Sequence, residues 1–483
     1  MWLKAAWIIY GPVVYITLIL SWFNLTTLWA LGYTLFLILL SLTCALLTRA
    51  HFGVSKYVKI LIIGAGPAGL ACAQALGNKD YLLLERGKLH KNRNHNDPAD
   101  LVQGVFGAGG FSDGKFSFFP SSSWLWQKQV FGVGWSYSHW LKPWLESFGV
   151  SCPNVPTEPS AFTPADDAWT LKAYPSEYAS LSTRIAMADN LVAAAGDRLK
   201  THQHVKSILS VMLPSPDPNP TNVYESAGIS FGHAILYFWN WLRGIPMHAN
   251  FLVETQNSSY TCSQIVLAGG RFMPSLYSEM EETWRRVEFG VRLETKDTNP
   301  YFQTSSLADP KYIYPFPEGE WRTFCCCRQG QVVETKDCSS LLTWSGRSDV
   351  KATEKSNIGF NVRILDEKVG RVIHTDLFQP HRNKSFTFPL AQVLADPSQL
   401  QPFYGKGTSY LIQGLQNLLS QFPELEEARV VGRTIEGVGT YPLFDKSFQV
   451  APNMYVCGDA TGVVRGLVAS LLTGHIVGTT LAL

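Results

Sequence analysis

The order of apolar and polar residues divides the chain into an uncharged beginning and a longer mixed body. Between residues 5 and 48 there is no charged side chain. Within this segment, residues 5–23 and 28–47 are each close to the ~20 residues that a helix needs to cross a bilayer. Lys4 precedes the first stretch and Arg49 follows the second. Because positive residues favour the cytosolic side, the pattern predicts two spans with both flanks in the cytosol.

Residues 1–50 are therefore expected to form a transmembrane anchor in contact with membrane lipid. The rest of the chain would face the cytosol, at the endoplasmic reticulum if the chain is eukaryotic. One alternative is a single span at 28–47, with the first stretch lying in the membrane interface. Another is a cleaved signal peptide, which is disfavoured because the apolar stretch exceeds roughly 7–15 residues and ends in Arg49, not in a small-residue cleavage site.

Short apolar runs separated by glycines characterise the next segment. Ile60-Leu61-Ile62-Ile63 leads into Gly64-Ala65-Gly66-Pro67-Ala68-Gly69, a helical run at 70–77, a second apolar run at 81–84 and then Glu85. The glycines allow a tight turn, close approach of the backbone to a pyrophosphate, and close packing of helix on strand. An acidic residue about twenty positions on accepts hydrogen bonds from a ribose. This order predicts a Rossmann-like dinucleotide site but does not separate FAD from NAD.

Two later segments favour FAD. Residues 258–267 are typical of a strand, and they lead into Ala268-Gly269-Gly270, where small residues let the backbone approach a cofactor. Residues 453–457 predict another strand, followed by Gly458-Asp459 and a helix expected to start near Val463. Asp459 would bond the ribityl chain of a flavin, and the helix would direct its positive end at flavin O2 and N1. The alternative for Gly458-Asp459 is an ordinary helix N-cap.

These motifs resemble those of the bacterial-type FAD-dependent dehydrogenases, which belong to the glutathione-reductase-like flavoproteins with two dinucleotide-binding domains. The matching stretches lie at 60–87, 107–115 (Gly-Ala-Gly-Gly-Phe-Ser-Asp-Gly-Lys), 322–325 and 458–474, with a looser match at 345–348 and from Asn357 onward. Together they cover most of 58–483, and residues 1–50 have no counterpart. Where members carry a plainer Cys-x-x-x-Gly, this chain departs with Cys325-Cys326-Cys327-Arg328-Gln329-Gly330. The resemblance implies the fold, the FAD cofactor and a redox class, but no substrate.

The residues expected to contact FAD occupy glycine-rich turns, strand ends and the start of the last helix. They are Gly64, Gly66, Ala68, Gly69, Glu85, Arg86, Gly109, Gly110, Ser112, Asp113, Lys115, Gly269, Gly458, Asp459 and Gly466. Lys115 and Arg465 are the candidates for catalytic residues. Lys115 could reach a phosphate or the flavin edge, and Arg465 could pair with a substrate carboxylate or the reduced flavin. The alternatives are a simple turn at Asp113-Gly114 and a surface salt bridge.

The predicted fold class is α/β, with a Rossmann-like FAD-binding domain formed by 55–275 and 440–483. A mainly β substrate domain at 276–439 is inserted in it, and one or two transmembrane helices precede it. Residues 213–220 form a proline-rich loop that cannot pair in a sheet. Residues 231–246 are apolar and aromatic but too short to span a bilayer, so they form either an interfacial helix or a buried one. For residues 124–148 the same choice arises, and a position in the core is favoured.

Composition narrows the range of partners. The formal net charge is +2, which gives no basic field for nucleic acid. Charged residues make up 16% and aromatic residues 13% of the chain, a balance that indicates contact with lipid or an apolar ligand. Nine cysteines occur without a CxxC pair or Cys/His metal spacing, which indicates a reducing compartment and no metal site.

Several candidates for chemistry have ordinary structural alternatives. Cys325–Cys327 are expected to be core or cofactor-proximal thiols, because adjacent cysteines bridge only with strain and no CxxxxC pair follows Gly69. His374, His381 and His475 could act as acids or bases, but a single histidine is more often a structural residue. No second GxGxxG occurs. A separate nicotinamide domain is therefore not expected, and any NAD(P)H would bind transiently at the flavin face.

These observations predict a membrane-anchored FAD-dependent oxidoreductase, a dehydrogenase or reductase. It would pass a hydride between a lipophilic small molecule and flavin N5. An FAD-dependent monooxygenase using NAD(P)H and O2 is one alternative, but the segment 458–462 reads Gly-Asp-Ala-Thr-Gly, not the Gly-Asp-Ala-Ala-His form of such hydroxylases. The other alternative is a non-catalytic flavin-binding redox sensor.

Overall fold

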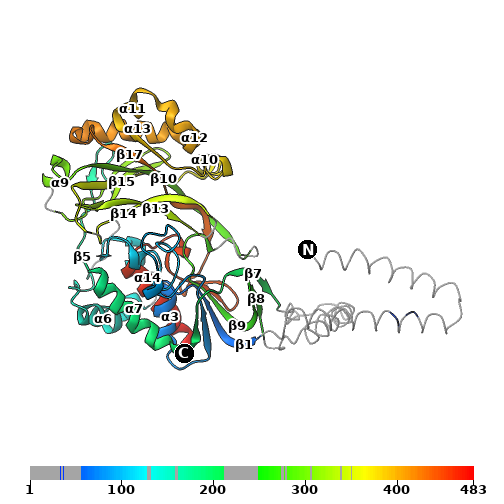
Figure 1. The fold of residues 1–483 in the computed structure, drawn as a ribbon. Helices are drawn as coiled ribbons and strands as arrows, with labels where there is room; N and C mark the ends of the chain where they lie inside the picture. The colour runs from blue at the N-terminus through cyan, green and yellow to red at the C-terminus, as the bar shows by residue number, and fades with distance from the viewer. Residues whose placement is uncertain are drawn as a thin grey trace. The chain divides into compact units, whose positions relative to one another are not determined.

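The computed structural model (Figure 1) divides into two compact units. The larger unit comprises residues 58–210, 250–257 and 262–483. The predicted spans at 5–23 and 28–47, the loop at 213–220 and the apolar stretch at 231–246 lie outside the described residues, apart from Tyr33 and Phe36. No helix within the described part of the chain is long and apolar enough to cross a bilayer. The described residues are 33, 36, 56–127, 132–157, 162–211, 249–273, 277, 280–304, 307–337, 340–349 and 351–483.

A largely parallel sheet forms the first layer of the larger unit. Strands β1 and β2 pair in parallel from Ile60 opposite Tyr81 to Ile63 opposite Leu84, and α3 connects them. The strand order is β18-β19-β9-β1-β2-β6, and β7 and β8 continue the sheet beside β9. The elements are β1 (Lys56–Ile63), α3 (Pro67–Leu76), β2 (Tyr81–Leu84), β6 (Leu199–Lys200), β7 (Val205–Ser210), β8 (Phe251–Thr255), β9 (Ser259–Leu267), β18 (Gln449–Ala451) and β19 (Met454–Val456).

The predicted strand–glycine–helix–strand order is confirmed, with two shifts in helix boundaries. Helix α3 begins at Pro67, not at residue 70, because proline at the first helical position loses no intrahelical hydrogen bond. The last helix, α14 (Leu467–Ala482), begins four residues later than the predicted start near Val463. Gly462 and Gly466 both have positive φ values, of 71° and 94°, so the backbone between them cannot be helical.

Helices α3 and α14 pack with their backbones in contact. A Cβ atom added at Gly474 would collide with the Ala68 carbonyl, and one added at Gly478 would lie 2.5 Å from the Cys72 carbonyl oxygen. Residues without a side chain, spaced four apart, let two helices approach this closely. As a result, α14 is buried along most of its length, and α7 (Leu181–Ala195) packs against α3 as well.

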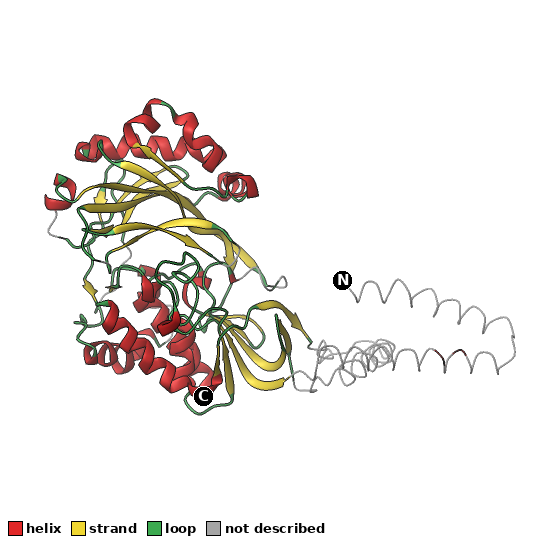
Figure 2. Cartoon of the chain, viewed as in Figure 1, coloured by secondary structure: helices red, strands yellow, loops and turns green. Residues whose placement is uncertain are grey.

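An antiparallel sheet of seven strands forms the second layer, in the order β16-β17-β10-β15-β12-β11-β4. Helices α10 to α13 cover one of its faces (Figure 2), so the region predicted to be mainly β contains substantial helix. The assignment of 276–439 as a substrate domain stays a prediction. The elements are β4 (Thr170–Leu171), β10 (Glu282–Lys296), β11 (Tyr312–Phe316), β12 (Gly319–Cys327), β15 (Lys355–Ile364), α10 (Glu367–Leu377), β16 (Phe386–Pro389), α11 (Leu390–Ala395), α12 (Gln401–Tyr404), α13 (Thr408–Gln421) and β17 (Arg429–Pro442). Strands β13 (Gln331–Lys336) and β14 (Leu342–Arg347) form a separate two-stranded sheet.

The two faces of the second sheet differ in polarity because side chains alternate along each strand. In β10 the apolar residues from Val287 to Leu293 join the core formed with α10 and α13. The residues between them are polar, and Glu288 pairs with Arg363 of β15 on the opposite face. This face carries a buried network of charges.

The described residues of the segment 124–148 include short helices whose apolar side chains enter the core, as predicted. They are α4 (Ser123–Trp126), α5 (Val133–Ser136), a π-helical turn (Tyr137–Leu141) and α6 (Lys142–Ser147). Leu125, Tyr137, Leu141 and Leu145 are each at most 1% exposed. Trp135, by contrast, has 54% of its surface exposed.

Candidate functional site

The three glycines of the first motif have different surroundings. A Cβ atom at Gly64 would lie 2.7 Å from the Ala268 carbonyl oxygen, and one at Gly69 would collide with the Gly64 carbonyl. Both positions therefore need glycine for packing. At Gly66, the N-cap of α3, an added Cβ would meet only the Ala268 carbonyl oxygen, at 4.0 Å. Gly66 thus borders open space at a helix N-terminus, where backbone N–H groups favour an anion.

Glu85 ends β2 and is 7% exposed. One carboxylate oxygen accepts a hydrogen bond from Ala65 N at 2.9 Å, and the other accepts from Gly87 N at 2.8 Å and Gly104 N at 3.1 Å. A carboxylate has about four lone-pair sites, so roughly one remains for a ribose hydroxyl. Through these hydrogen bonds Glu85 also holds the glycine turn in place. This structural role was not predicted from the sequence. Arg86, beside it, is partly exposed.

The loop at 107–115 packs against the N-terminal ends of both α3 and α14. A Cβ atom at Gly107 would lie 3.2 Å from Pro67 Cδ, and one at Gly109 would lie 2.9 Å from Leu467 Cδ2. Gly110 packs on the ring of Phe106, and Ser112 Oγ donates to the Gly109 carbonyl at 3.3 Å. The loop therefore spans the distance between the two helix N-termini that the sequence assigns to the cofactor.

Lys115 leaves this loop and forms an ion pair with Asp309, while Asp113 lies 3.7 Å from its Nζ. Burial opposes the positive charge, but the two carboxylates outweigh it and raise the pKa of Lys115. Asp309 also accepts from Tyr174 OH at 3.1 Å and from Cys326 N at 2.8 Å. Lys115 is thus a buried link between the first motif loop and the second sheet. Its predicted contact with the cofactor stays a prediction.

The C-terminal motif lies against the first motif. Gly458 has φ 68°, and a Cβ atom there would lie 2.9 Å from Ala68 Cβ. Gly458 N donates to Thr473 Oγ1 of α14 at 2.9 Å. Gly466, the N-cap of α14, has no heavy atom near its Cβ direction and is exposed. Gly269 likewise follows β9 at the surface, where a Cβ would meet only Met273.

Asp459 belongs to a network of two arginines and two carboxylates. Arg271 Nε donates to Asp459 Oδ2 at 3.0 Å and Arg271 Nη1 donates to Glu436 Oε2 at 3.1 Å, while Arg465 Nη1 donates to Glu436 Oε2 at 2.6 Å. Burial opposes the negative charge of Asp459, but Arg271 and Arg465 outweigh it and lower its pKa. The remaining oxygen, Asp459 Oδ1, is buried, lies 3.6 Å from Arg465 Nε and accepts no hydrogen bond from the described residues. An orphaned acceptor at this position fits a hydroxyl donor.

Glu436, Arg271 and Asp309 were not identified from the sequence. Glu436 lies at a β-bulge, because Glu288 pairs with Gly437 while the next residue, Phe289, pairs with Ile435. Bulges redirect a side chain out of the regular alternation and are common beside active sites. Arg271 directly follows the Gly269-Gly270 pair, a signal that was present in the sequence. Asp309 precedes β11 without any local motif.

The remaining candidates have structural surroundings. His475 of α14 stacks on Trp140 with ring centroids 4.2 Å apart, and burial lowers its pKa to about 4. His374 packs on Phe378 within α10, and His381 lies in an exposed turn. These positions favour the structural alternative for all three.

The cysteine run contains two thiols in van der Waals contact. Cys325 Sγ and Cys327 Sγ are 3.8 Å apart and unbridged, at a bulge in β12 where Cys325 has φ 50°. Its hydrogen bond to Cys327 and then burial raise the pKa of the Cys325 thiol. Asp113 lies 3.4 Å from Cys325 Sγ. The run therefore contacts the loop assigned to the cofactor without forming a disulfide.

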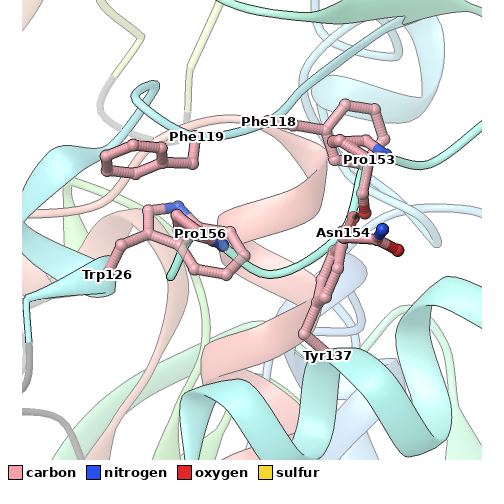
Figure 3. A pocket seen from close by; sticks show the side chains of 7 residues that line it. All are labelled: Phe118, Phe119, Trp126, Tyr137, Pro153, Asn154 and Pro156. Atoms are coloured by element: carbon pink, nitrogen blue, oxygen red, sulfur yellow. Dashed lines mark hydrogen bonds between the residues drawn. The ribbon is translucent and has the colours of Figure 1, made fainter. Parts of the chain in front are cut away.

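A small apolar cavity of about 210 Å³ is lined by residues outside these motifs (Figure 3). Its one phenol, Tyr137 OH, donates to the Pro153 carbonyl at 2.7 Å. This volume is below the ~300 Å³ of typical small-molecule sites. Its lining consists of Phe118, Phe119, Trp126, Tyr137, Pro153, Asn154 and Pro156.

Comparison with known proteins gives distant structural matches. No protein-family model and no curated protein match the chain. The amino acid oxidase NikD, a Tyr258Phe mutant in its open form, is 11% identical with a TM-score of 0.41, covering 89% of this chain and 94% of that one. CtdE in complex with FAD is 9% identical with a TM-score of 0.38, covering 88% and 84%. The tetracycline destructase Tet(51) is 12% identical with a TM-score of 0.35, covering 89% and 82%.

Proposed function

We propose that the chain is an FAD-dependent oxidoreductase. The observation that carries the proposal is the contact between Gly458 and Ala68, which brings the two sequence motifs together beside an orphaned acceptor, Asp459 Oδ1. Gly66 and Gly466 border open space at the N-termini of α3 and α14. An isolated glycine turn or an ordinary helix N-cap would not require these features in one place.

Each part of the site has a defined task toward FAD. The N-terminus of α3 would take the pyrophosphate, and Glu85 would accept from a ribose hydroxyl with its remaining lone pair. Asp459 Oδ1 would accept from a ribityl hydroxyl. The N-terminus of α14 would favour negative charge on the reduced ring. When bound, FAD supplies two-electron chemistry by accepting or donating a hydride.

The arginine network holds Asp459 ionised and in place. Because Arg271 and Arg465 are themselves bound by Glu436, their positive charges stay fixed beside the site. Arg465 is therefore better suited to positioning Asp459 than to pairing with a substrate. The motif match supports membership of the glutathione-reductase-like flavoproteins, with the FAD-binding domain at 55–275 and 440–483.

The finer proposal is a dehydrogenase or reductase that is anchored in a membrane and acts on a lipophilic small molecule. The uncharged segment at 5–48 and the high aromatic content support it. The missing second GxGxxG motif supports transient use of NAD(P)H, if the nucleotide is used at all.

Spectroscopy of the full chain in mild detergent tests the proposal. We expect the absorption bands of oxidised flavin in the purified protein and FAD, not FMN, in the released cofactor. Anaerobic stopped-flow mixing with NADPH then separates the classes. Rapid bleaching together with O2-dependent product formation would identify a monooxygenase instead, and inertness toward every donor would identify a sensor. A folded protein that binds no flavin would overturn the proposal.

A further inference from the structure

The polar face of the second sheet holds more positive than negative charge. Glu288 and Glu320 are the carboxylates of this network. Glu288 accepts from Arg363 at 3.1 Å and from Arg286 at 3.1 Å, and Glu320 lies 2.8 Å from Arg363 and 3.2 Å from Arg322. These two acids serve three arginines, and two lysines lie beside them. Lys172, Lys311 and Arg322 form what we call the cationic cluster.

Arg322 has an unpaired Nε in its guanidinium group. The residue is 5% exposed on β12, and its Nη1 lies 3.2 Å from Glu320 Oε1 and 3.8 Å from Glu288 Oε1. Its Nε is buried and has no hydrogen-bond partner in the described part of the chain. The Nε–Nη2 edge of a guanidinium is a fork that matches the two oxygens of a carboxylate. Leaving a buried N–H unpaired costs free energy, so an external acceptor is expected here.

Lys311 directly precedes β11, and its ammonium group has no hydrogen bond or ion pair among the described residues. The charges around it are Arg322, Lys172, Asp309 and Glu288. Both carboxylates are already bonded, Asp309 to Lys115 and Glu288 to Arg363. No carboxylate among the described residues therefore forms an ion pair with Lys311.

Lys172 connects the cluster to the C-terminal motif. Its backbone N–H donates to the Lys311 carbonyl at 2.8 Å, which places the two lysines on neighbouring chain segments. Its Nζ donates to Ser123 Oγ at 3.0 Å. The preceding residue, Ser122, donates from Oγ to the Arg465 carbonyl at 2.9 Å. Consecutive serines thus join the cluster to the segment that opens α14, where the flavin ring is expected.

We infer that the substrate is a lipophilic carboxylic acid whose carboxylate binds to the unpaired Nε of Arg322 and to Lys311 and Lys172. This inference rests on the proposed function, because the flavin site gives the cluster its reacting partner. A neutral lipophilic substrate would leave Arg322 Nε and the Lys311 amine without an acceptor, whereas a carboxylate can accept from both and from Lys172. The apolar part of such a molecule agrees with the membrane-associated substrate proposed above.

Calorimetric titration of the full chain with octanoate tests this inference, with octan-1-ol as the neutral match of equal chain length. We expect octanoate to bind at least about tenfold more tightly than octan-1-ol, because charge-assisted hydrogen bonds are involved. Lys311→Met and Arg322→Gln should each weaken octanoate binding about tenfold or more and leave octan-1-ol unchanged. Lys368→Met, at an exposed position of α10, is the matched control.

Calorimetry does not depend on flavin, so the two proposals fail separately. If the folded protein binds octanoate but binds no FAD, the result would support the cationic cluster and overturn the proposed function. Flavin-loaded protein that binds octanoate no better than octan-1-ol, or equally well in the folded Lys311→Met variant, would overturn the cluster. If Arg322→Gln fails to fold, Lys172→Gln replaces it with the same expectation. Inorganic phosphate that competes more strongly than octanoate would exclude a carboxylate as the natural ligand.

Discussion

The Glu436 carboxylate accepts a hydrogen bond of 2.6 Å from Arg465 Nη1, which ties the bulge of β17 to the segment that opens α14. The same carboxylate accepts from Arg271 Nη1 at 3.1 Å, at the end of the β9 segment. One side chain of the second sheet thus holds two arginines from the first layer. The ionised state and position of Asp459 depend on both.

Replacing Glu436 by glutamine should loosen this network. The amide keeps the shape but removes the charge that two partly buried arginines share. We expect the free energy of unfolding to fall by about 1–3 kcal/mol, measured by chemical denaturation. Glu367→Gln, which breaks an exposed i,i+4 pair with Arg371, should change it by less than about 0.5 kcal/mol. If both substitutions change the free energy of unfolding equally, Glu436 contributes no more than an exposed ion pair.

Two glycines of the same motif should respond differently to alanine. At Gly69 a methyl group collides with the Gly64 carbonyl, so Gly69→Ala should reduce the yield of folded protein. At Gly66 the methyl group enters open space, so Gly66→Ala should fold normally. It should nevertheless weaken FAD binding at least about tenfold, because the methyl group occupies the space assigned to the pyrophosphate. Unchanged FAD affinity in folded Gly66→Ala would place the cofactor elsewhere.

Octanoate binding should depend on pH through Lys311. Burial lowers the pKa of Lys311 well below 10.5, Arg322 and Lys172 lower it further, and Asp309 and Glu288 oppose this. The protonated amine binds an anion, so affinity should be greatest below the pKa of Lys311 and fall as pH rises through it. Calorimetry in buffers of different ionisation enthalpy should show proton uptake on binding. Lys311→Met should remove both effects, and a pH-independent affinity in the wild-type chain would contradict this prediction.

Glu288 should contribute to acid sensitivity. Burial raises its pKa, but Arg322, Arg465 and Arg286 outweigh this and lower it from 4.5 to about 2. The stabilisation is therefore complete above about pH 4.5 and is lost as pH falls toward 2, amounting to about 3 kcal/mol. The stability difference between wild type and Glu288→Gln should shrink by about this amount over that interval. Glu427→Gln, at an exposed position, is the control.

The Cys325 thiol should react slowly with alkylating reagents. Its raised pKa leaves little thiolate at pH 8, and the thiolate is the reactive form. Mass spectrometry after iodoacetamide treatment should find the peptide containing Cys325 largely unmodified in the native protein and modified after denaturation. Rapid labelling of the native protein would indicate an activated thiol.

The first layer of the fold could be predicted because its signals are local. The apolar run before Gly64, the glycine spacing and Glu85 lie within about 25 residues, and each element follows directly from the preceding one. The start of α14 could not be placed, because Val463 and Val464 are apolar residues that suit either helix or turn. The positive φ values of Gly462 and Gly466 decide the boundary.

The second sheet illustrates what sequence alone leaves open. Apolar and polar residues alternate along β10, but this pattern does not show whether Arg286 and Glu288 face solvent or a functional site. Lys172, Lys311 and Arg322 meet only because β4, β11 and β12 become neighbours in the sheet. Glu436 reaches Arg465 through a bulge, an irregularity of pairing that no residue type specifies.

The contact of Gly474 and Gly478 with α3 also bears on how the chain is made. Ala68 leaves the ribosome about 400 residues before its partner, which at 5–20 residues per second is roughly 20–80 s. During that interval the apolar face of α3 has no α14 to cover it. The dinucleotide-binding layer therefore closes only after α14 has been synthesised, long after α3.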